Sequence, residues 1–345
     1  MTKTLAGALA ATVIATGAAA QSSQLRTEEM TVQSDPGIQI YVRNKYPADM
    51  TVFRPEWTVV FVHGATNPAS TGFDLRLGGL SWMDHIASRG YDVYLLDLRG
   101  YGRSTRPKEM DEDPKANPPL VRGDVALRDI GAVVDFVLKR RNIPRVNLIG
   151  HSWGTTLMAA YATQNPSKVA RLVLYAPRWL RTTPSPVAAQ AGSGPLGAYR
   201  LVTVAQTHAR RMMGVPEAAR AGLFPPGWFE AWAEATWASD PKAATHNPPA
   251  MRAPNGTVQD TLEYWSAAKP YYDPAKIAAP TLLVLGEWDN DTPPAMAQTL
   301  FPLLVNSPGK RLVILGQGTH VIYMERNRLD LFRPVQSFLD EGATP

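Results

Sequence analysis

The pentapeptide Gly-His-Ser-Trp-Gly at residues 150–154 places a serine between two glycines. A serine hydroxyl is a poor nucleophile unless a base takes its proton, and that base is in turn held by an acid. Asp289 and His320 follow Ser152 in this order along the chain, and each comes after an apolar run. These residue types predict acyl-transfer chemistry in which Ser152 attacks, His320 takes the proton and Asp289 orients the imidazole.

Three carboxylates compete for the role of the acid. Glu287, Asp289 and Asp291 follow the apolar run "TLLVLG". Asp289 is the predicted acid, because the Gly-x-x-Asp spacing after a strand puts it at the tip of the loop. Asp291 is the alternative, and Glu287 is interpreted as a solvated loop carboxylate or a turn cap.

An acyl-transfer site also needs two backbone N–H groups that point at the developing oxyanion. Trp153, the residue after the predicted nucleophile, is expected to supply one. Ala65 follows His63-Gly64 at the end of "WTVVFVHG" and is expected to supply the other. The histidines beside these positions, His63 and His151, are interpreted as structural.

The flanking sequence predicts the elements that hold these residues. Continuous apolar runs such as "VVFV", "VYLL", "VNLI" and "LLVL" alternate with helical patterns, which is typical of a parallel sheet covered on both faces. Ser152 lies between such a strand and a helix, the setting of a nucleophile elbow. The pattern over 125–138 predicts a helix with Asp124 as its N-cap. The predicted fold class is α/β, a doubly wound, mostly parallel sheet.

One region interrupts this alternation. Residues 178–275 contain no convincing strand, so they are predicted to form a helical cap inserted between a first part of the core at 21–177 and a second part at 276–345. Trp228 and Trp232 lie four residues apart and share one helix face. We interpret this face as packing against the core, with the lining of an apolar acyl or aryl pocket as the alternative.

The same insertion is rich in arginine. Residues 178–220 contain six arginines and a single carboxylate, Glu217. A solvated basic face is the plain interpretation. Attraction of an anionic substrate or of an envelope surface is the alternative.

The N-terminal residues have the form of a secretory signal peptide. Lys3 precedes a short stretch rich in Ala, Gly and Thr, and Ala18-Ala19-Ala20 provides a cleavage signal. Residues 1–20 are therefore predicted to be removed after Ala20, which leaves a periplasmic or secreted enzyme. No other apolar run approaches the length of a membrane span.

Composition narrows the classes of ligand. The chain has 345 residues, a net charge of +5 and no cysteine, so it has neither a thiol nucleophile nor a cysteine-ligated metal. No Lys/Arg run resembles a nucleic-acid-binding arm. Gly100 and Gly102 match only a fragment of a dinucleotide loop. We predict a small-molecule ester or amide substrate, no cofactor and no metal.

Taken together, "VVFVHG", "LLDLRGYGRS", "LIGHSWG", "LLVLGEWDNDTP" and "GQGTH" make the chain resemble the α/β-hydrolase superfamily. The resemblance implies an eight-stranded sheet with a cap entering after the sixth strand. Serine at the elbow, where epoxide hydrolases and haloalkane dehalogenases carry aspartate, implies acyl-transfer chemistry, and hydrolysis of a carboxylic ester is the predicted reaction. "GHSWG" and "DLRGYGRS" also look like proline iminopeptidases, although "HGATNPAS" departs from their H-G-G-P-G loop.

Other activities of the superfamily use the same triad. Hydrolysis of lactones or of carbon–carbon bonds and cofactor-free perhydrolysis are therefore alternatives alongside iminopeptidase-like activity. A non-catalytic binding protein on a hydrolase scaffold is disfavoured, because decay of such a site usually removes the serine or the histidine.

Overall fold

A computed structural model of the chain describes residues 24–190, 192 and 194–341. The predicted signal peptide at 1–20 and its cleavage position lie outside the described residues. Within them, no helix has both the length and the apolar character needed to cross a membrane.

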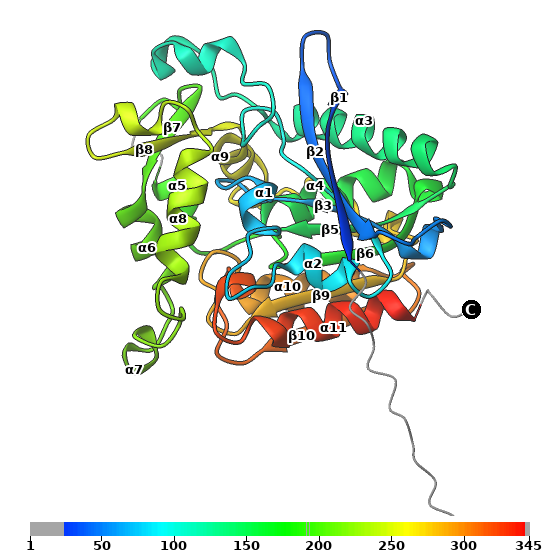
Figure 1. The fold of residues 1–345 in the computed structure, drawn as a ribbon. Coiled ribbons are helices and arrows are strands. Elements are labelled where there is room, and N and C mark those ends of the chain that lie inside the picture. The colour runs from blue at the N-terminus through cyan, green and yellow to red at the C-terminus, as the bar shows by residue number, and fades with distance from the viewer. Residues whose placement is uncertain (1–23, 191, 193, 342–345) are drawn as a thin grey trace, which may run out of the picture.

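An eight-stranded sheet forms the centre of the molecule, with the strand order β1-β2-β4-β3-β5-β6-β9-β10. The last six strands in this order are parallel, and the hairpin β1–β2 joins them in antiparallel register at one edge (Figure 1). This confirms the predicted mostly parallel sheet. The strands of both sheets are β1 (Leu25–Gln33), β2 (Gln39–Pro47), β3 (Thr58–Val62), β4 (Asp92–Leu96), β5 (Val146–His151), β6 (Val169–Tyr175), β7 (Tyr199–Thr203), β8 (Ala250–Pro254), β9 (Thr281–Gly286) and β10 (Arg311–Leu315).

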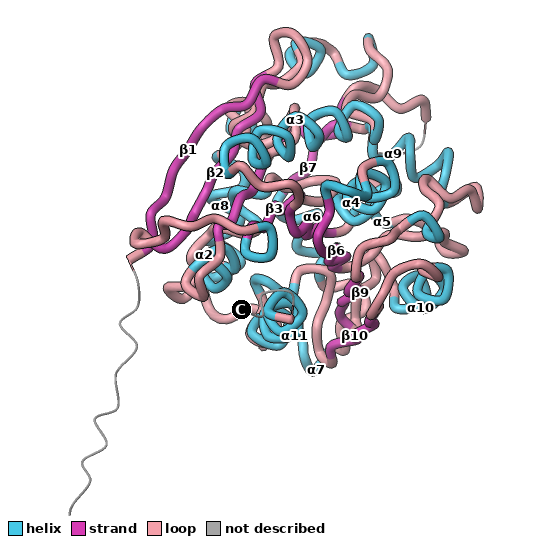
Figure 2. Tube along the Cα trace, turned by 90° about the vertical axis from the view of Figure 1, so that its right-hand side faces the viewer, coloured by secondary structure: helices cyan, strands magenta, loops and turns pink. Residues whose placement is uncertain are grey.

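Helices cover both faces of this sheet, as the turned view in Figure 2 shows. Helices α3, α4 and α10 pack on one face, whereas α2 and α11 pack on the other. The α-helices are α1 (Ala69–Gly72), α2 (Trp82–Ala87), α3 (Gly123–Arg141), α4 (Trp153–Gln164), α5 (Pro186–Ala189), α6 (Val204–Arg211), α7 (Glu217–Arg220), α8 (Trp228–Ala238), α9 (Gly256–Asp260), α10 (Pro294–Leu300) and α11 (Arg328–Asp340). The short helical turns are η1 (Pro55–Trp57), η2 (Lys108–Asp111), η3 (Pro114–Ala116), η4 (Pro166–Lys168), η5 (Ala243–Thr245), η6 (Thr261–Trp265), η7 (Pro274–Lys276), η8 (Phe301–Leu303) and η9 (Ile322–Met324).

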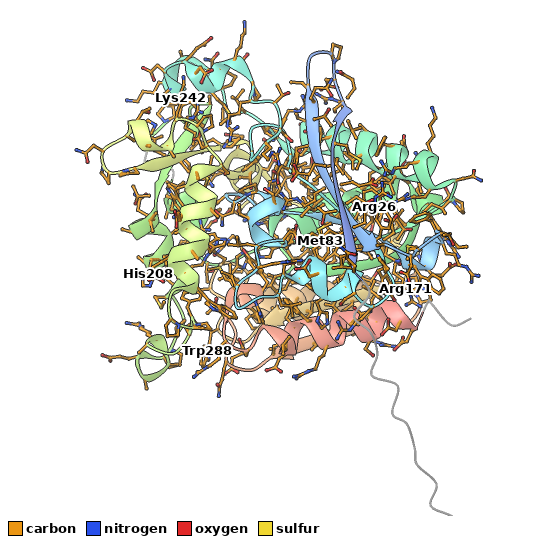
Figure 3. The ribbon with its side chains drawn as sticks, in the orientation of Figure 1. Arg26, Met83, Arg171, His208, Lys242 and Trp288 are labelled. Carbon is orange, nitrogen blue, oxygen red and sulfur yellow. The ribbon has the colours of Figure 1, made fainter. Side chains whose placement is uncertain are left out.

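The continuous apolar strands split their side chains between two cores. In β3, Val60 and Val62 belong to the cluster under α3 and α4, while Val59 and Phe61 belong to the cluster under α2 and α11. This alternation follows from the two-residue period of a strand. Side chains fill the space around the ribbon in Figure 3, where the buried Met83 of α2 is labelled.

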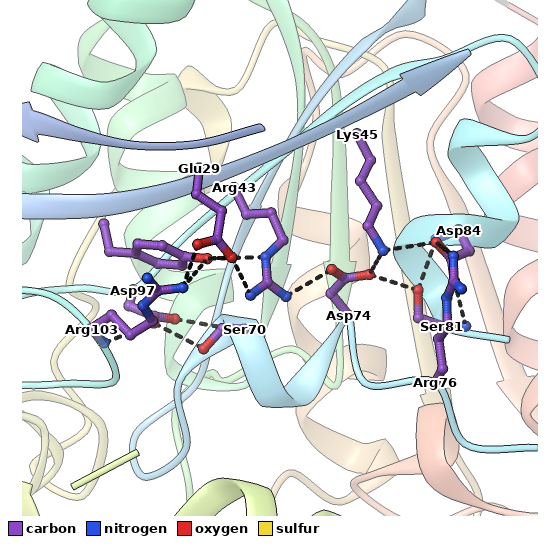
Figure 4. A network of polar contacts seen from close by, with 11 residues as sticks. Glu29, Arg43, Lys45, Ser70, Asp74, Arg76, Ser81, Asp84, Asp97 and Arg103 are labelled. Atoms are coloured by element: carbon purple, nitrogen blue, oxygen red, sulfur yellow. Dashed lines mark hydrogen bonds and ion pairs between the residues drawn. The ribbon is translucent and has the colours of Figure 1, made fainter. Parts of the chain in front are cut away.

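A polar network fastens the hairpin to the segment that follows β3 (Figure 4). Asp74 accepts from Arg43 of β2 at 2.8 Å and pairs with Lys45 of the same strand at 2.5 Å. Asp97, directly after β4, accepts from the Ser70 backbone N–H and hydroxyl at 3.0 and 2.9 Å. These contacts fix the chain just beyond Ala65, one of the predicted oxyanion residues.

The insertion enters after β6, the sixth strand of the chain, and returns at β9. It lies to the left of the sheet in Figure 1 and carries helices α5 to α9. The expectation that it lacks strands was wrong, since β7 and β8 pair in an antiparallel two-stranded sheet. The pattern hid these strands because Arg200 and Arg252 occupy buried positions in them, which breaks the apolar alternation of a half-buried strand.

The start of helix α3 also differs from the prediction. Its N-cap position is Arg122, so Asp124 lies inside the first turn rather than at the cap. The Gly123 N–H instead donates to the Asp260 carboxylate at 2.8 Å, and Arg122 pairs with the same carboxylate at 2.7 Å. Asp260, a residue of the insertion, therefore caps the N-terminus of α3 in place of a local side chain.

Candidate active site

The loops after parallel strands meet at the carboxyl edge of the sheet, where ligands bind in open α/β folds. Ala65 follows β3, Ser152 follows β5, Asp289 follows β9 and His320 follows β10. Ser152 and His320 line one cavity, together with Gly64 and Ala65. Strands that are far apart in the sequence thus bring the predicted site residues together.

Ser152 occupies a tight turn between β5 and α4, with φ 57° and ψ −118°. This backbone region is sparsely populated for residues other than glycine, which is the expected strain of a nucleophile elbow. A Cβ atom on Gly150 would lie 2.4 Å from the Gly154 carbonyl oxygen, and one on Gly154 would lie 2.6 Å from the His63 carbonyl oxygen. Gly150 is required because the backbone of Gly154 approaches it across the turn, and Gly154 is required because the backbone at the end of β3 lies against it.

His320 is held by a carboxylate. Its Nδ1 lies 2.8 and 3.0 Å from the two Asp289 oxygens, and both side chains are buried. Asp289 also accepts from the Thr292 backbone N–H at 2.8 Å and from the Thr292 hydroxyl at 2.7 Å. These contacts assign the Nδ1 proton to the Asp289 side, which leaves Nε2 as the nitrogen able to accept a proton.

Asp291, the alternative acid, has different partners. Its carboxylate pairs with Arg211 at 3.1 Å and lies 3.5 Å from the Arg210 Nε. Burial raises the pKa of Asp291, but the charges of Arg210 and Arg211 outweigh it and hold that pKa below its ordinary value. The geometry therefore favours Asp289 as the partner of His320.

The two predicted oxyanion donors flank the serine. Trp153 is the first residue of α4, so its N–H has no carbonyl partner within the helix. Gly64 passes so close that a Cβ atom there would lie 2.9 Å from the Ser152 Cβ. The Ala65 carbonyl accepts from the Tyr101 hydroxyl at 3.0 Å and from Arg200 at 3.1 Å, which fixes the orientation of this loop.

The neighbouring histidines have structural contacts. The Leu98 N–H donates to His63 Nε2 at 3.0 Å, and His63 Nδ1 lies 2.8 Å from the Gly64 carbonyl. Burial lowers the pKa of His63, so it is neutral. His151 lies 2.9 Å from the His320 carbonyl through its Nε2 and stacks on Tyr175 at 4.8 Å.

The arginine-rich segment is not the solvated face that its composition suggests. Of its six arginines, Arg220 is exposed, and the other five are buried: Arg178, Arg181, Arg200, Arg210 and Arg211. Most of the guanidinium hydrogen bonds go to backbone carbonyls, to hydroxyls and to Asp291. These acceptors leave no charge pattern near the arginines in the sequence, so residue spacing alone did not reveal the burial. The sequence signal was the shortage of carboxylates in that segment.

Trp228 and Trp232 of α8 do not lie in the pocket that was the alternative interpretation of this helix face. Trp232 is fully buried in a cluster with Phe229 and Trp237, and Trp228 lies against Gly78 and under the Arg328 guanidinium. Neither tryptophan lines the cavity that contains Ser152. This arrangement favours the packing interpretation over a substrate pocket, because α8 turns both indoles toward neighbouring elements of the fold.

Among residues 24–190, 192 and 194–341, no group of three or more His, Cys, Asp or Glu side chains has a spacing suited to a metal ion. The groups around the cavity are instead suited to proton transfer and anion stabilisation.

Comparisons with known proteins identify the family and the fold. A family profile described as "alpha/beta hydrolase fold" matches residues 58–327. The chain is 31% identical over 117 residues to 2-hydroxy-6-oxononadienedioate/2-hydroxy-6-oxononatrienedioate hydrolase of Cupriavidus pinatubonensis, which covers 34% of this chain and 35% of that protein. It is 30% identical over 127 residues to 1-acylglycerol-3-phosphate O-acyltransferase ABHD5 of Rattus norvegicus, which covers 35% of this chain and 33% of that protein. The matches thus span about a third of these relatives.

Solved structures share the fold over a much longer stretch. A thermophilic esterase from Thermogutta terrifontis superimposes with a TM-score of 0.60 at 16% identity, over 92% of this chain and all of that one (100%). A membrane phospholipase A gives the same TM-score at 20% identity, over 92% of this chain and 87% of that one.

Proposed function

The chain belongs to the α/β-hydrolase family, and from this membership we propose that it is a serine hydrolase that cleaves carboxylic esters. The observation that carries the proposal is that His320, hydrogen-bonded to Asp289, lines the same cavity as a serine on a strained elbow. A nucleophile, a base and an orienting acid are the three groups that this chemistry requires.

The proposed reaction runs through an acyl-enzyme. His320 Nε2 takes the proton of Ser152 as its Oγ attacks the ester carbonyl, and the Ala65 and Trp153 N–H groups stabilise the oxyanion. His320 then returns the proton to the leaving alcohol. Water, deprotonated by the same imidazole, attacks the acyl-serine, and collapse of the second oxyanion releases the acid and restores Ser152. Asp289 keeps its charge throughout and stabilises the imidazolium.

A fluorophosphonate probe and a substrate panel test this function. We expect the probe to label the wild-type protein but not Ser152→Ala, and p-nitrophenyl esters to be cleaved faster than lactones or aminoacyl anilides. Cleavage of anilides alone would replace ester hydrolysis with an iminopeptidase-like activity. Failure of the probe to label a folded protein would indicate a non-catalytic scaffold.

The predicted signal peptide supports a second proposal, that the enzyme acts outside the cytoplasm. Expression of the full chain with a C-terminal tag, followed by cell fractionation and N-terminal sequencing, tests it. We expect the mature protein in the periplasm or medium, beginning at Gln21. Retention of an uncleaved chain in the cytoplasm would refute it.

A further inference from the structure

Three arginines line the same cavity as Ser152 and His320. Arg178 follows β6, and Arg210 and Arg211 end helix α6 of the insertion. At most 9% of each residue is exposed to solvent. Long cationic side chains usually reach the surface with their charged ends, so their burial around a reactive serine needs an explanation.

The charges around this cavity do not balance. Asp291 is the carboxylate that lines it, and Arg210 and Arg211 share that one group. The Arg178 guanidinium meets no carboxylate at ion-pair distance among the described residues, and its Nη1 instead donates to the hydroxyls of Thr261 at 2.9 Å and Thr257 at 3.4 Å. Three cations against one anion leave two positive charges in excess.

Hydrogen-bonding capacity is also unused. The Nε atoms of Arg178 and Arg211 are buried without a hydrogen-bond partner among the described residues. Buried polar groups are usually hydrogen-bonded in native proteins, and these two N–H groups each have a hydrogen bond left to donate to a bound anion. Burial, and next the charge of Arg181, lowers the pKa of Arg178 to about 9, and burial likewise lowers the pKa of Arg210 to about 10. An anion in the cavity would offset this cost.

We propose that Arg178, Arg210 and Arg211 bind an anionic group of the substrate, so that the preferred esters carry a carboxylate or phosphate near the scissile carbonyl. The planar guanidinium fork matches the geometry of both groups. Because Ser152 and the three arginines line the same cavity, the anionic group and the ester carbonyl must belong to one substrate molecule. This inference rests on the proposed serine-hydrolase function and names its substrate class.

Matched esters test the proposal. The substrates are the mono-p-nitrophenyl ester of adipic acid, its neutral carboxamide analogue, and the p-nitrophenyl ester of 5-phosphonopentanoic acid. We expect the wild-type kcat/KM for the better anionic ester to exceed that for the amide at least ~10-fold, as a charged hydrogen bond implies. The two anionic esters distinguish a carboxylate from a phosphate as the group recognised. Equal rates on charged and neutral esters would overturn the proposal.

Variants locate the effect. Arg178→Gln should lower the ratio of kcat/KM between the anionic and neutral esters by roughly 10- to 100-fold. Arg220→Gln, an exposed position in the same insertion, is the matched control and should preserve the ratio. Parallel losses on both substrates in Arg178→Gln would show that this arginine is structural. If that variant does not fold, stronger competitive inhibition of the wild type by adipate than by adipamide supports the site, and equal inhibition refutes it.

A binding measurement tests the anion site independently of the proposed serine-hydrolase activity. Ser152→Ala cannot turn over ester, so its melting temperature is measured with adipate, inorganic phosphate and neutral adipamide. A rise in Tm with either anion but not with adipamide supports an anion site, even if fluorophosphonate labelling has excluded a nucleophilic Ser152. No rise with either anion overturns the anion site, even if ester hydrolysis is confirmed.

Discussion

At the scale of single residues, the reacting groups act as a unit. Ser152→Ala and His320→Ala should each lower kcat by on the order of 10⁴ to 10⁶, because either loss removes the whole nucleophilic route. Hydrolysis of p-nitrophenyl acetate measures the effect, and a melting curve shows that each variant is folded. Turnover close to that of the wild type in either folded variant would exclude the mechanism.

Substitutions of the two aspartates in the loop after β9 should have different effects on activity and stability. Asp289→Asn should cut kcat by roughly 10⁴ with little loss of stability, because the amide would hold the imidazole in the wrong tautomer. Asp291→Asn should instead destabilise the fold by about 3–5 kcal/mol, because it leaves Arg210 and Arg211 buried without their carboxylate. Kinetics and urea unfolding on both variants measure the two effects. The opposite pattern would make Asp291 the acid.

At the scale of elements, the insertion is joined to the oxyanion loop. Arg200 of β7 donates to the Ala65 carbonyl at 3.1 Å and to the Thr66 hydroxyl at 3.0 Å, so a strand of the insertion positions a loop of the core. Arg200→Gln should reduce kcat about 10- to 100-fold, with a smaller change in KM, because the oxyanion N–H groups matter most in the transition state. Partial recovery of kcat in Arg200→Lys would distinguish positioning from a general loss of packing. An equal change in kcat and KM would argue against it.

Helix α8 has a packing role that the same kinetics can separate. Trp232 is fully buried between Phe229 and Trp237, so Trp232→Ala should cost about 3–5 kcal/mol of stability. Because this indole does not line the cavity, acetyl and long-acyl esters should lose activity in parallel. A selective loss of long-acyl hydrolysis, with stability retained, would restore the pocket assignment.

At the scale of the whole molecule, one buried carboxyl makes stability depend on pH. Glu325 accepts from the Thr319 N–H at 3.1 Å and from the Thr319 hydroxyl, just before His320. Burial raises the pKa of Glu325 to about 7, although the Thr319 contacts oppose this. The folded state therefore binds this proton more tightly than the unfolded chain does, so the group's contribution to stability is greatest below pH 4.5 and is lost as the pH rises through 7.

The neutral variant isolates this effect. The free energy of unfolding of Glu325→Gln, minus that of the wild type, should increase between pH 4.5 and pH 7.5 by on the order of 3 kcal/mol. Urea unfolding of both proteins at several pH values measures the difference. A difference that does not change with pH would contradict the raised pKa.

The sequence alone determined the features that rest on local chemistry and chain order. Gly150 and Gly154 predict the elbow because only small residues fit its backbone, and Ser152, Asp289 and His320 each follow the end of an apolar strand in that order along the chain. Apolar runs of the strand type predict a parallel sheet, since its strands are buried on both faces.

Tertiary structure decided whatever depends on partners that are distant in the chain. Asp289 and Asp291 are two residues apart, and only packing sends one to His320 and the other to the α6 arginines. Arginine has the same local preferences whether it is solvated or buried, so the burial of Arg178 and Arg200 could not be predicted from spacing. Similarly, the period of α8 placed Trp228 and Trp232 on one face, but only the surrounding elements determined that this face packs inside the fold rather than against a substrate.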